Sequence, residues 1–344
     1  MSVTHGADER CLVLTEAENA SIGDLAQALV AEYGSADEDR FLADLPLQSA
    51  RLPRRVWRFL RDFTQTEERG YCVVRNNPVD DDRIGPTPAH WQGRLRPNRE
   101  QAEEVVLLLY AGVLGEPFAW RTQQDGRVIH DVLPIAGHEH EQLGTGSEEV
   151  ITWHTEDAFH PFRGDYLLLG ALRNHERAAT TVSELDVSLL SDEDLDTLFE
   201  PRFRILPDNS HLPQHNAETA GHTRESFELI TRMRDDPTPV PILYGSRSAP
   251  YLCLDPYFMP EIVADEPARR ALANLVAALD KTLGDLVLAA GDYLVVNNHR
   301  AVHGRRPFKA RFDGSDRWLK RMNVTNDLRR SRVLRPSPGS RVIG

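Results

Sequence analysis

From Trp120 onward the chain is divided into short apolar segments that are separated by Gly, Pro, Asp or Asn. Many short strands with few helices between them are typical of an antiparallel sandwich or barrel. Two helices are expected to interrupt the strands, at 191–199 and 267–283. We expect strands at 128–133, 166–172, 180–182, 203–206, 240–244, 251–254, 293–296 and 317–324.

The first part of the chain has a different pattern. Residues 15–33 predict a helix, because Thr15 and Glu18 have capping-box spacing and apolar residues recur on one face. Residues 37–66 predict one or two further helices, and 98–114 a helix that stops at Gly115. A short strand at 70–75 and a loop at 79–98 lie between them. Helices should therefore pack outside a double-stranded sandwich.

Composition and charge exclude several classes of protein. The 344 residues are 40% hydrophobic and 27% charged, as in ordinary globular chains, and no apolar run approaches the ~20 residues of a membrane span. The N-terminus lacks the pattern of a signal peptide. Cys11, Cys72 and Cys253 are odd in number and widely spaced, which favours a reducing cytoplasm. The net charge of −13 disfavours nucleic acid as a partner and suits a small cationic substrate.

A histidine and a carboxylate stand two residues apart at His154 and Glu156. Alternate residues of a strand point the same way, so the two side chains would project together. Of the thirteen histidines, only His154 has an acid at this offset. By itself the spacing is weak, and an ordinary strand histidine beside a solvated acid explains it as well.

The distal part of the chain changes that balance. His303 offers a third ligand, and two histidines with one carboxylate form the facial triad of non-haem Fe(II) oxygenases. Further on, Arg317, Leu319 and Arg321 share one face of an extended strand. Two inward arginines are costly unless each meets an anion. The alternative is that they lie on the solvated face of an edge strand.

At these residues the sequence resembles the clavaminate synthase-like Fe(II)/2-oxoglutarate dioxygenases. It is most similar to the arginine hydroxylases of viomycin and streptothricin biosynthesis, with the enduracididine and asparagine hydroxylases close by. The resemblance implies a mainly β fold, a distorted double-stranded β-helix (jelly roll) with additional N-terminal and inserted α-helices. The motifs that carry it lie at 117–126, 154–156, 254–259, 303–305 and 316–321.

The same resemblance implies one domain over residues 1–344. Residues 1–115 would form a mostly helical part packing on the core, 116–327 the jelly-roll catalytic core with insertions, and 328–344 a flexible C-terminal tail. Its iron ligands would be His154, Glu156 and His303. Arg317 would clamp the distal carboxylate of 2-oxoglutarate, helped by the hydroxyl of Thr180 or Thr181, and O2 is the other co-substrate.

The resemblance also implies how an amino acid would bind. Arg321 would bind its α-carboxylate, while Gln123 and the second oxygen of Glu156 would take its α-amino group. Asp255 would pair with a cationic guanidinium. Viomycin-type arginine hydroxylases carry a second acid two residues further on, where this chain has Tyr257, which could stack on or hydrogen-bond to the guanidinium. An alternative role for Asp255 is that of a turn residue before Pro256.

The resemblance therefore implies hydroxylation of an unactivated carbon (β and/or γ) of free L-arginine, in the biosynthesis of an antibiotic or another non-proteinogenic amino acid. Enduracididine or another amino acid such as asparagine is the alternative substrate. A non-catalytic jelly-roll binding protein is the alternative from another class. His138 and His140 form a further His-x-His pair, but they lie in the Gly-rich loop 137–146, which we expect to be an active-site lid.

Overall fold

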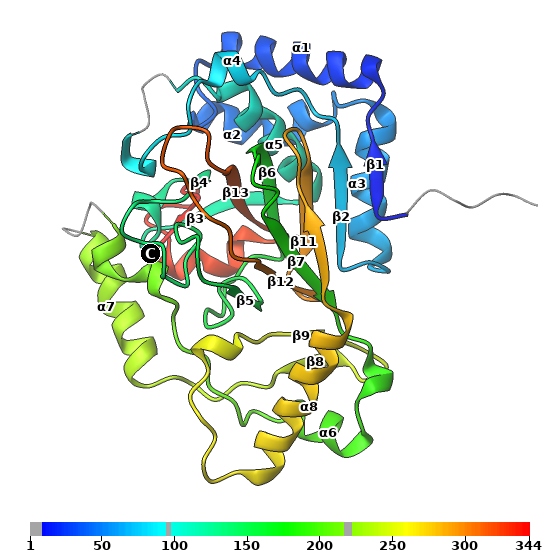
Figure 1. Cartoon of the computed structure of the whole chain (residues 1–344), viewed down its shortest axis with the longest axis vertical. Helices are drawn as coiled ribbons and strands as arrows, with labels where there is room; N and C mark the ends of the chain where they lie inside the picture. The colour runs from blue at the N-terminus through cyan, green and yellow to red at the C-terminus, as the bar shows by residue number, and fades with distance from the viewer. Residues whose placement is uncertain (1–8, 94–97, 217–221) are drawn as a thin grey trace, which may run out of the picture.

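The computed structural model describes residues 9–93, 98–216 and 222–344, and its core is a pair of facing β-sheets (Figure 1). Neighbouring strands are antiparallel except for the pairs β1–β2 and β14–β3. In order, the large sheet contains β1 (Cys11–Val13), β2 (Tyr71–Arg75), β11 (Tyr293–Asn297), β6 (Tyr166–Arg173), β13 (Trp318–Thr325), β3 (Glu116–Trp120) and β14 (Val342–Ile343), with β4 (His130–Val132) also on β13. The small sheet contains β10 (Gly284–Val287), β7 (Ala179–Glu184), β12 (Ala301–Arg305) and β5 (Ile151–His154), and a separate hairpin joins β8 (Leu243–Ser246) to β9 (Ala249–Leu252).

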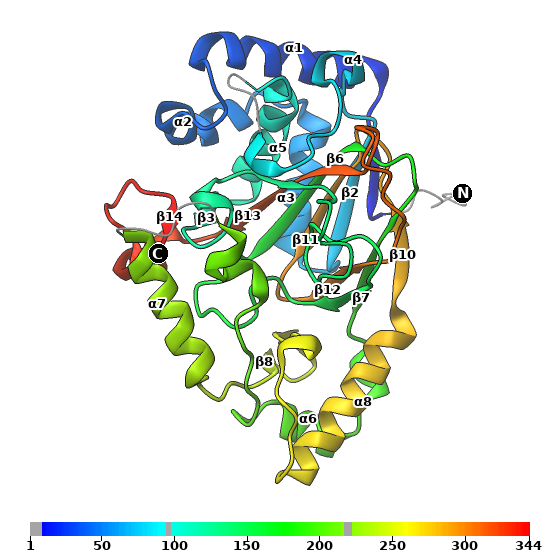
Figure 2. The same ribbon diagram turned by 60° about the vertical axis from the view of Figure 1, so that its left-hand side comes forward.

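Helices cover the outer side of each sheet (Figures 1 and 2). The N-terminal helices lie beyond the large sheet, and α6 and α8 lie beyond the small one. The helices are α1 (Glu16–Tyr33), α2 (Asp39–Ser49), α3 (Arg54–Thr66), α4 (Asp81–Ile84), α5 (Gln101–Leu114), α6 (Asp192–Leu198), α7 (His222–Asp235) and α8 (Glu266–Thr282). None of the helices in the described part of the chain has the length and apolarity needed to cross a membrane.

The large sheet is apolar on both faces because each face has its own cover. Leu167 and Leu169 of β6 pack into the core between the sheets, whereas Tyr166 and Leu168 pack against the helical layer. This alternation is the period of two that a strand imposes on its side chains. The arrangement leaves the inner faces of the two sheets, at one end of the core, free to hold a site.

Most expected helices and strands are present, but the expected loop at 79–98 contains the short helix α4, and three further expectations need correction. Residues 203–206 do not form a strand; only Phe203 makes a single bridge, to Val240. Helix α7 was not expected. The C-terminal segment 328–344 is not a free tail, because β14 adds to the edge of β3 and buries Ile343. The structure does not describe residues 1–8, which belong to the segment that was searched for a signal-peptide pattern. Residues 94–97 of the expected loop also lie outside the described residues.

Lys320 connects strand β13 to the helical layer. Its Nζ atom lies 2.9 Å from carboxylate oxygens of Glu100 and Glu104 and 2.5 Å from Asp131 Oδ1, and the side chain is 1% exposed. We expect Lys320→Met to lower the free energy of unfolding by about 3–5 kcal/mol, because it leaves buried carboxylates without their cation. Denaturant unfolding measures the change. The exposed Lys281→Met should stay within about 0.5 kcal/mol, and a similar small change for Lys320→Met would contradict the interpretation.

Candidate active site

The predicted metal ligands meet where β5 and β12 pair. His154 and His303 are direct register partners across these antiparallel strands, and their ring centroids are 4.6 Å apart. Glu156 follows β5, and its Oε2 atom lies 3.6 Å from His154 Nε2 and 3.2 Å from His303 Nε2. The three residues thus offer two imidazole nitrogens and one carboxylate oxygen to a single ion.

Neighbouring groups fix the orientation of these ligands. His154 Nδ1 lies 2.8 Å from the carbonyl oxygen of Thr152, which places a proton on Nδ1 and directs Nε2 toward Glu156. The Asn298 side chain accepts from Glu156 N at 2.8 Å and donates to Glu156 O at 3.0 Å. Asn298 therefore holds the backbone of Glu156, a role that no sequence pattern indicated. The donor set fits a borderline metal such as Fe(II).

Close approach of the two strands requires a glycine after His303. A Cβ atom on Gly304 would lie 2.5 Å from the carbonyl oxygen of Ile151.

Burial alone would raise the pKa of Glu156, but the Arg321 cation and the two histidines hold this pKa well below its ordinary value. Glu156 is therefore an ionised carboxylate in a buried position.

A cavity of about 120 Å³ adjoins the three ligands, and Arg317 lies in its wall. This guanidinium is 4% exposed and its Nη2 lies 3.4 Å from Thr180 Oγ1, while its Nε has no hydrogen-bond partner within the described residues. Burial, together with the nearby Arg305 cation, lowers the pKa of Arg317 to about 9. A buried cation with unused donors beside a cavity is suited to an anionic ligand.

The structure separates the two threonines that the sequence left as alternatives. Thr180 lines the cavity, whereas Thr181 is not among its lining residues. Adjacent residues of β7 point to opposite faces, which accounts for the difference. Thr181 Oγ1 instead lies beside Gly304, where it would be 2.9 Å from a Cβ atom added to that glycine.

Arg321 lies on the other side of the three predicted metal ligands and contacts two predicted site residues, Glu156 and Gln123, together with His130, which was not predicted. Its Nη1 lies 2.5 Å from Glu156 Oε1, and its Nη2 lies 2.8 Å from Gln123 Oε1 and 2.8 Å from His130 Nδ1. Gln123 lines a neighbouring cavity of about 190 Å³, and Arg321 borders both cavities. Arg317 and Arg321 therefore face the interior, and the solvated edge-strand alternative is wrong.

Asp255 and Tyr257 lie at a further part of the cavity wall. Asp255 Oδ1 accepts the backbone N–H groups of Tyr257 at 3.1 Å and Phe258 at 3.3 Å, so the residue does stabilise a turn. It also lines the cavity, and burial raises its pKa to about 6. Tyr257 borders the same cavity but is 54% exposed.

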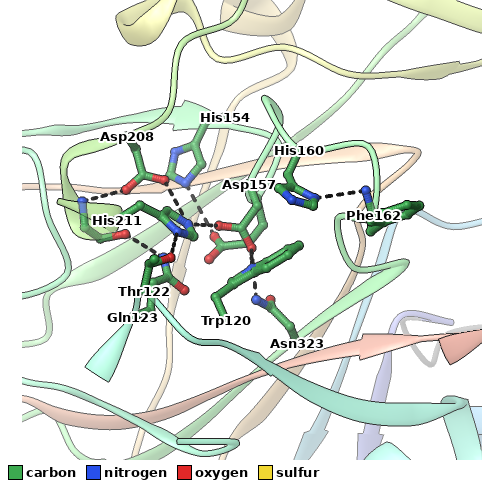
Figure 3. Close-up of polar contacts among 12 residues, drawn as sticks. Trp120, Thr122, Gln123, His154, Asp157, His160, Phe162, Asp208, His211 and Asn323 are labelled. Atoms are coloured by element: carbon green, nitrogen blue, oxygen red, sulfur yellow. Dashed lines mark hydrogen bonds and ion pairs between the residues drawn. The ribbon is translucent and has the colours of Figure 1, made fainter. Parts of the chain in front are cut away.

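Asp208 lines this cavity too, and no sequence pattern pointed to it. Its segment is anchored by His211, which is fully buried and bonds Thr122 Oγ1 through Nδ1 at 2.7 Å and Asp157 Oδ1 through Nε2 at 3.1 Å. Asp157 Oδ2 accepts from Trp120 Nε1 at 2.6 Å (Figure 3). Asp157, the residue after Glu156, thus helps to position Asp208 at the cavity through its contact with His211.

Comparison with known proteins agrees with this geometry. The L-ornithine/L-arginine 3-hydroxylase of Catenulispora acidiphila is 43% identical over 339 residues, covering 96% of this chain and 99% of that protein. The enduracididine beta-hydroxylase of Streptomyces hygroscopicus is 43% identical over 338 residues, with the same coverage. The crystal structure of the non-heme iron oxygenase OrfP, in complex with Fe, succinate and (3S)-hydroxy-L-Arg, has a TM-score of 0.95 and 51% identity, and covers 97% of this chain and 99% of that one.

The fold expected from the sequence, a jelly roll with added helices, is confirmed by this structural match. A model of the taurine catabolism dioxygenases (TauD, TfdA family) matches residues 61–323, a span that contains His154, Glu156, His303, Arg317 and Arg321. The chain belongs to the TauD/TfdA family of dioxygenases.

Proposed function

We propose that this dioxygenase uses Fe(II), 2-oxoglutarate and O2 to hydroxylate the β and/or γ carbon of free L-arginine, in the biosynthesis of an antibiotic or another non-proteinogenic amino acid. The observation that carries the proposal is the cavity itself. It has the three metal-ligating side chains in its wall, the buried Arg317, and the carboxylates Asp208 and Asp255. The names of the two relatives, an ornithine/arginine hydroxylase and an enduracididine hydroxylase, support the choice of a guanidino substrate.

His154, Glu156 and His303 would hold the Fe(II), which together with 2-oxoglutarate and O2 supplies the oxidising power for attack on an unactivated C–H bond. Arg317 would form a two-pronged contact with the distal carboxylate of 2-oxoglutarate. Because Arg317 is buried, the pair would be much stronger than one in water. Thr180, at 3.4 Å from Arg317, would add a hydroxyl to the same carboxylate.

Arg321, Glu156 and Gln123 would fix the backbone of the substrate. Arg321 already contacts Oε1 of Glu156 and Oε1 of Gln123, so its cation and two acceptors lie within one small region. A free amino acid could place its carboxylate on Arg321 and its ammonium on the two oxygens. Holding both ends of the backbone places the β and γ carbons at a fixed distance from the metal ligands, which is the main contribution of the protein to such a reaction.

The guanidinium would lie between Asp208 and Asp255. The charge of Asp208 is one of the causes of the raised pKa of Asp255, after burial, so the two carboxylates repel each other across the cavity. A guanidinium between them would neutralise that repulsion. Asp208 therefore provides a second acid from a different segment, although Tyr257 stands where the arginine hydroxylases of the resembled group carry theirs.

A second candidate substrate is enduracididine, a cyclised guanidino amino acid. The 43% identity to an enduracididine beta-hydroxylase favours it, and it would use the same two carboxylates. Asparagine would leave both carboxylates without a cation, which is costly in a buried cavity. A non-catalytic binding protein would have no need of the assembled triad and the buried Arg317.

A screen of 2-oxoglutarate turnover against free L-amino acids tests the proposal. We expect turnover with arginine, a product one oxygen atom heavier, and a β or γ position by NMR. Asp255→Asn should raise the KM for arginine about 100-fold, the effect of removing one partner of a buried charge pair. The KM for 2-oxoglutarate should stay the same, since Arg317 is unchanged.

Asp24→Asn, on the exposed face of α1, is the matched control and should behave as the wild type. Turnover with enduracididine and none with arginine would select the second candidate. An unchanged KM for arginine in Asp255→Asn would contradict the guanidinium role. Absence of 2-oxoglutarate decarboxylation with any amino acid would contradict the hydroxylase assignment.

We also propose a cytoplasmic location. Cys72 and Cys253 are buried free thiols, and free thiols are usual in a reducing compartment. Fractionation of the producing cells tests this proposal.

A further inference from the structure

A second group of metal-ligating side chains lies outside the triad, where the loop 137–149 meets the segment 209–216. His138 and Glu141 come from the loop, and His215 comes from the other segment. Glu141 Oε2 lies 3.8 Å from His138 Nδ1 and 3.9 Å from His215 Nδ1. One ligand atom from each residue can be chosen so that all three lie within 4.8 Å of one another.

Backbone contacts hold these three residues in place from both sides. Glu141 N donates to His138 O at 2.9 Å, so a tight turn puts their side chains close together. His215 ends a short 3-10 helix, and the next residue, Asn216, donates from Nδ2 to the carbonyl oxygen of Thr122 at 2.6 Å. The arrangement is therefore set by the two segments and needs little change to accept a ligand.

The central oxygen of this group, Glu141 Oε2, has no hydrogen-bond partner within the described residues. This atom is almost free of exposed surface, and separations of 3.8 and 3.9 Å are too long for hydrogen bonds. Ligands of a tetrahedral Zn²⁺ ion lie about 3.3–3.4 Å apart, given bonds of about 2.0–2.1 Å. Glu141 Oε2 and each histidine nitrogen would need to approach by about half an ångström.

The histidines are suitable ligands. Burial lowers the pKa of His215, which keeps its imidazole neutral, as metal binding requires. His138 Nδ1 is shared with Thr145 Oγ1 at 3.1 Å, a neutral hydrogen bond that an ion would replace at a net cost of about 1 kcal/mol. His140 of the same loop is different, because its side chain is 73% exposed.

Another histidine and acid group, around His211, shows the contrast (Figure 3). Both ring nitrogens of His211 are used by Thr122 and Asp157, and Asp157 also accepts from Trp120 and Asn323. Its atoms are saturated by the protein. Of these two groups, the one around Glu141 combines close ligand atoms with an unused buried oxygen.

We propose that His138, Glu141 and His215 form a second metal site, which binds Zn²⁺ with water as the fourth ligand and ties the loop 137–149 to the segment 209–216. Two histidines, one glutamate and a water are a known zinc donor set. Both segments border the cavity of about 190 Å³ that contains Gln123 and Arg321. An ion here would hold the cover over the substrate end of the active site.

The test uses untagged full-length chain in which His154→Ala and His303→Ala have removed the first site. Zn²⁺ is titrated against a chromophoric chelator, and Co²⁺ is followed by its visible absorption. We expect one equivalent with a Kd on the order of 1 μM or tighter, and two equivalents in the wild type. Adding His215→Ala or Glu141→Gln should weaken Zn²⁺ binding at the second site at least about a hundredfold. Even residues that only support metal ligands contribute about 10–100-fold to metal affinity.

His140→Ala is the matched control and should keep the equivalent at full affinity. Hydrogen exchange supplies a second readout: Zn²⁺ should slow amide exchange in the loop 137–149, and should not do so in His215→Ala. No bound equivalent, or one that persists in both His215→Ala and Glu141→Gln, overturns the proposal. The assay measures no turnover, and the variant used lacks two of the three proposed iron ligands. Its result is therefore independent of the hydroxylase assignment.

Discussion

His303→Ala should reduce turnover with 2-oxoglutarate and arginine at least about a thousandfold, because even groups that only support metal ligands contribute about 10–100-fold. His303 would be one of three metal ligands, and its Nε2 lies 3.2 Å from the Glu156 carboxylate. Without it, two protein ligands remain, and the metal would be held more weakly and in an undefined orientation. Fe(II) binding, measured by anaerobic titration, should fall with activity.

The exposed His175→Ala removes a histidine of the same chain away from the cavity and should leave both quantities unchanged. Circular dichroism and the melting temperature check that His303→Ala is folded. Full Fe(II) binding and turnover in folded His303→Ala would show that the metal is held elsewhere. Loss of turnover with Fe(II) retained would limit the role of His303 to orientation.

Arg317→Leu should raise the KM for 2-oxoglutarate by about 100- to 1,000-fold, which corresponds to about 3–4 kcal/mol for a buried charge pair that loses one partner. The guanidinium lies in the cavity wall with its Nε unpaired within the described residues, so a carboxylate of the co-substrate would be its main partner. The KM for arginine should change much less, since Arg321 carries the substrate carboxylate. Steady-state kinetics with each substrate varied in turn separates the two effects.

Arg317→Lys gives a graded test, because lysine keeps the charge but loses the planar two-pronged contact. It should recover part of the affinity for 2-oxoglutarate. Arg306→Leu removes a partly exposed arginine that follows β12 and pairs with Asp285, and it should leave both KM values unchanged. A larger effect of Arg317→Leu on the KM for arginine than on that for 2-oxoglutarate would exchange the proposed roles of Arg317 and Arg321.

Local periodicity was enough to predict which side chains of the site share a face along a strand or its extended end. The offset of two between His154 and Glu156, and the shared face of Arg317 and Arg321, both follow from the pleat of a strand. The structure places all four at the cavity. His303 was proposed from its residue type, and the strand that carries it, β12, was not among the expected strands.

Other parts of the site depend on contacts that no local pattern records. Asp208 lies on an irregular segment, and it reaches the cavity because His211 is bonded to Thr122 and Asp157. The meeting of His215 with Glu141 joins two loops of independent sequence. Helix α7 was missed because its sequence, 222–235, is largely polar, and a strong apolar stripe is the main helix signal.

The alternation of side chains along strand β13 determines which mutations this part of the chain can tolerate. Arg317 and Arg321 face the cavity, while Lys320, between them, faces the carboxylates of the helical layer. Inserting or deleting one residue within 318–320 would exchange these faces, because side chains alternate along a strand. A buried cation would then meet apolar core, and acids would lose theirs. Substitutions in this strand are therefore graded in effect, whereas a change in its length would remove co-substrate binding and stability together.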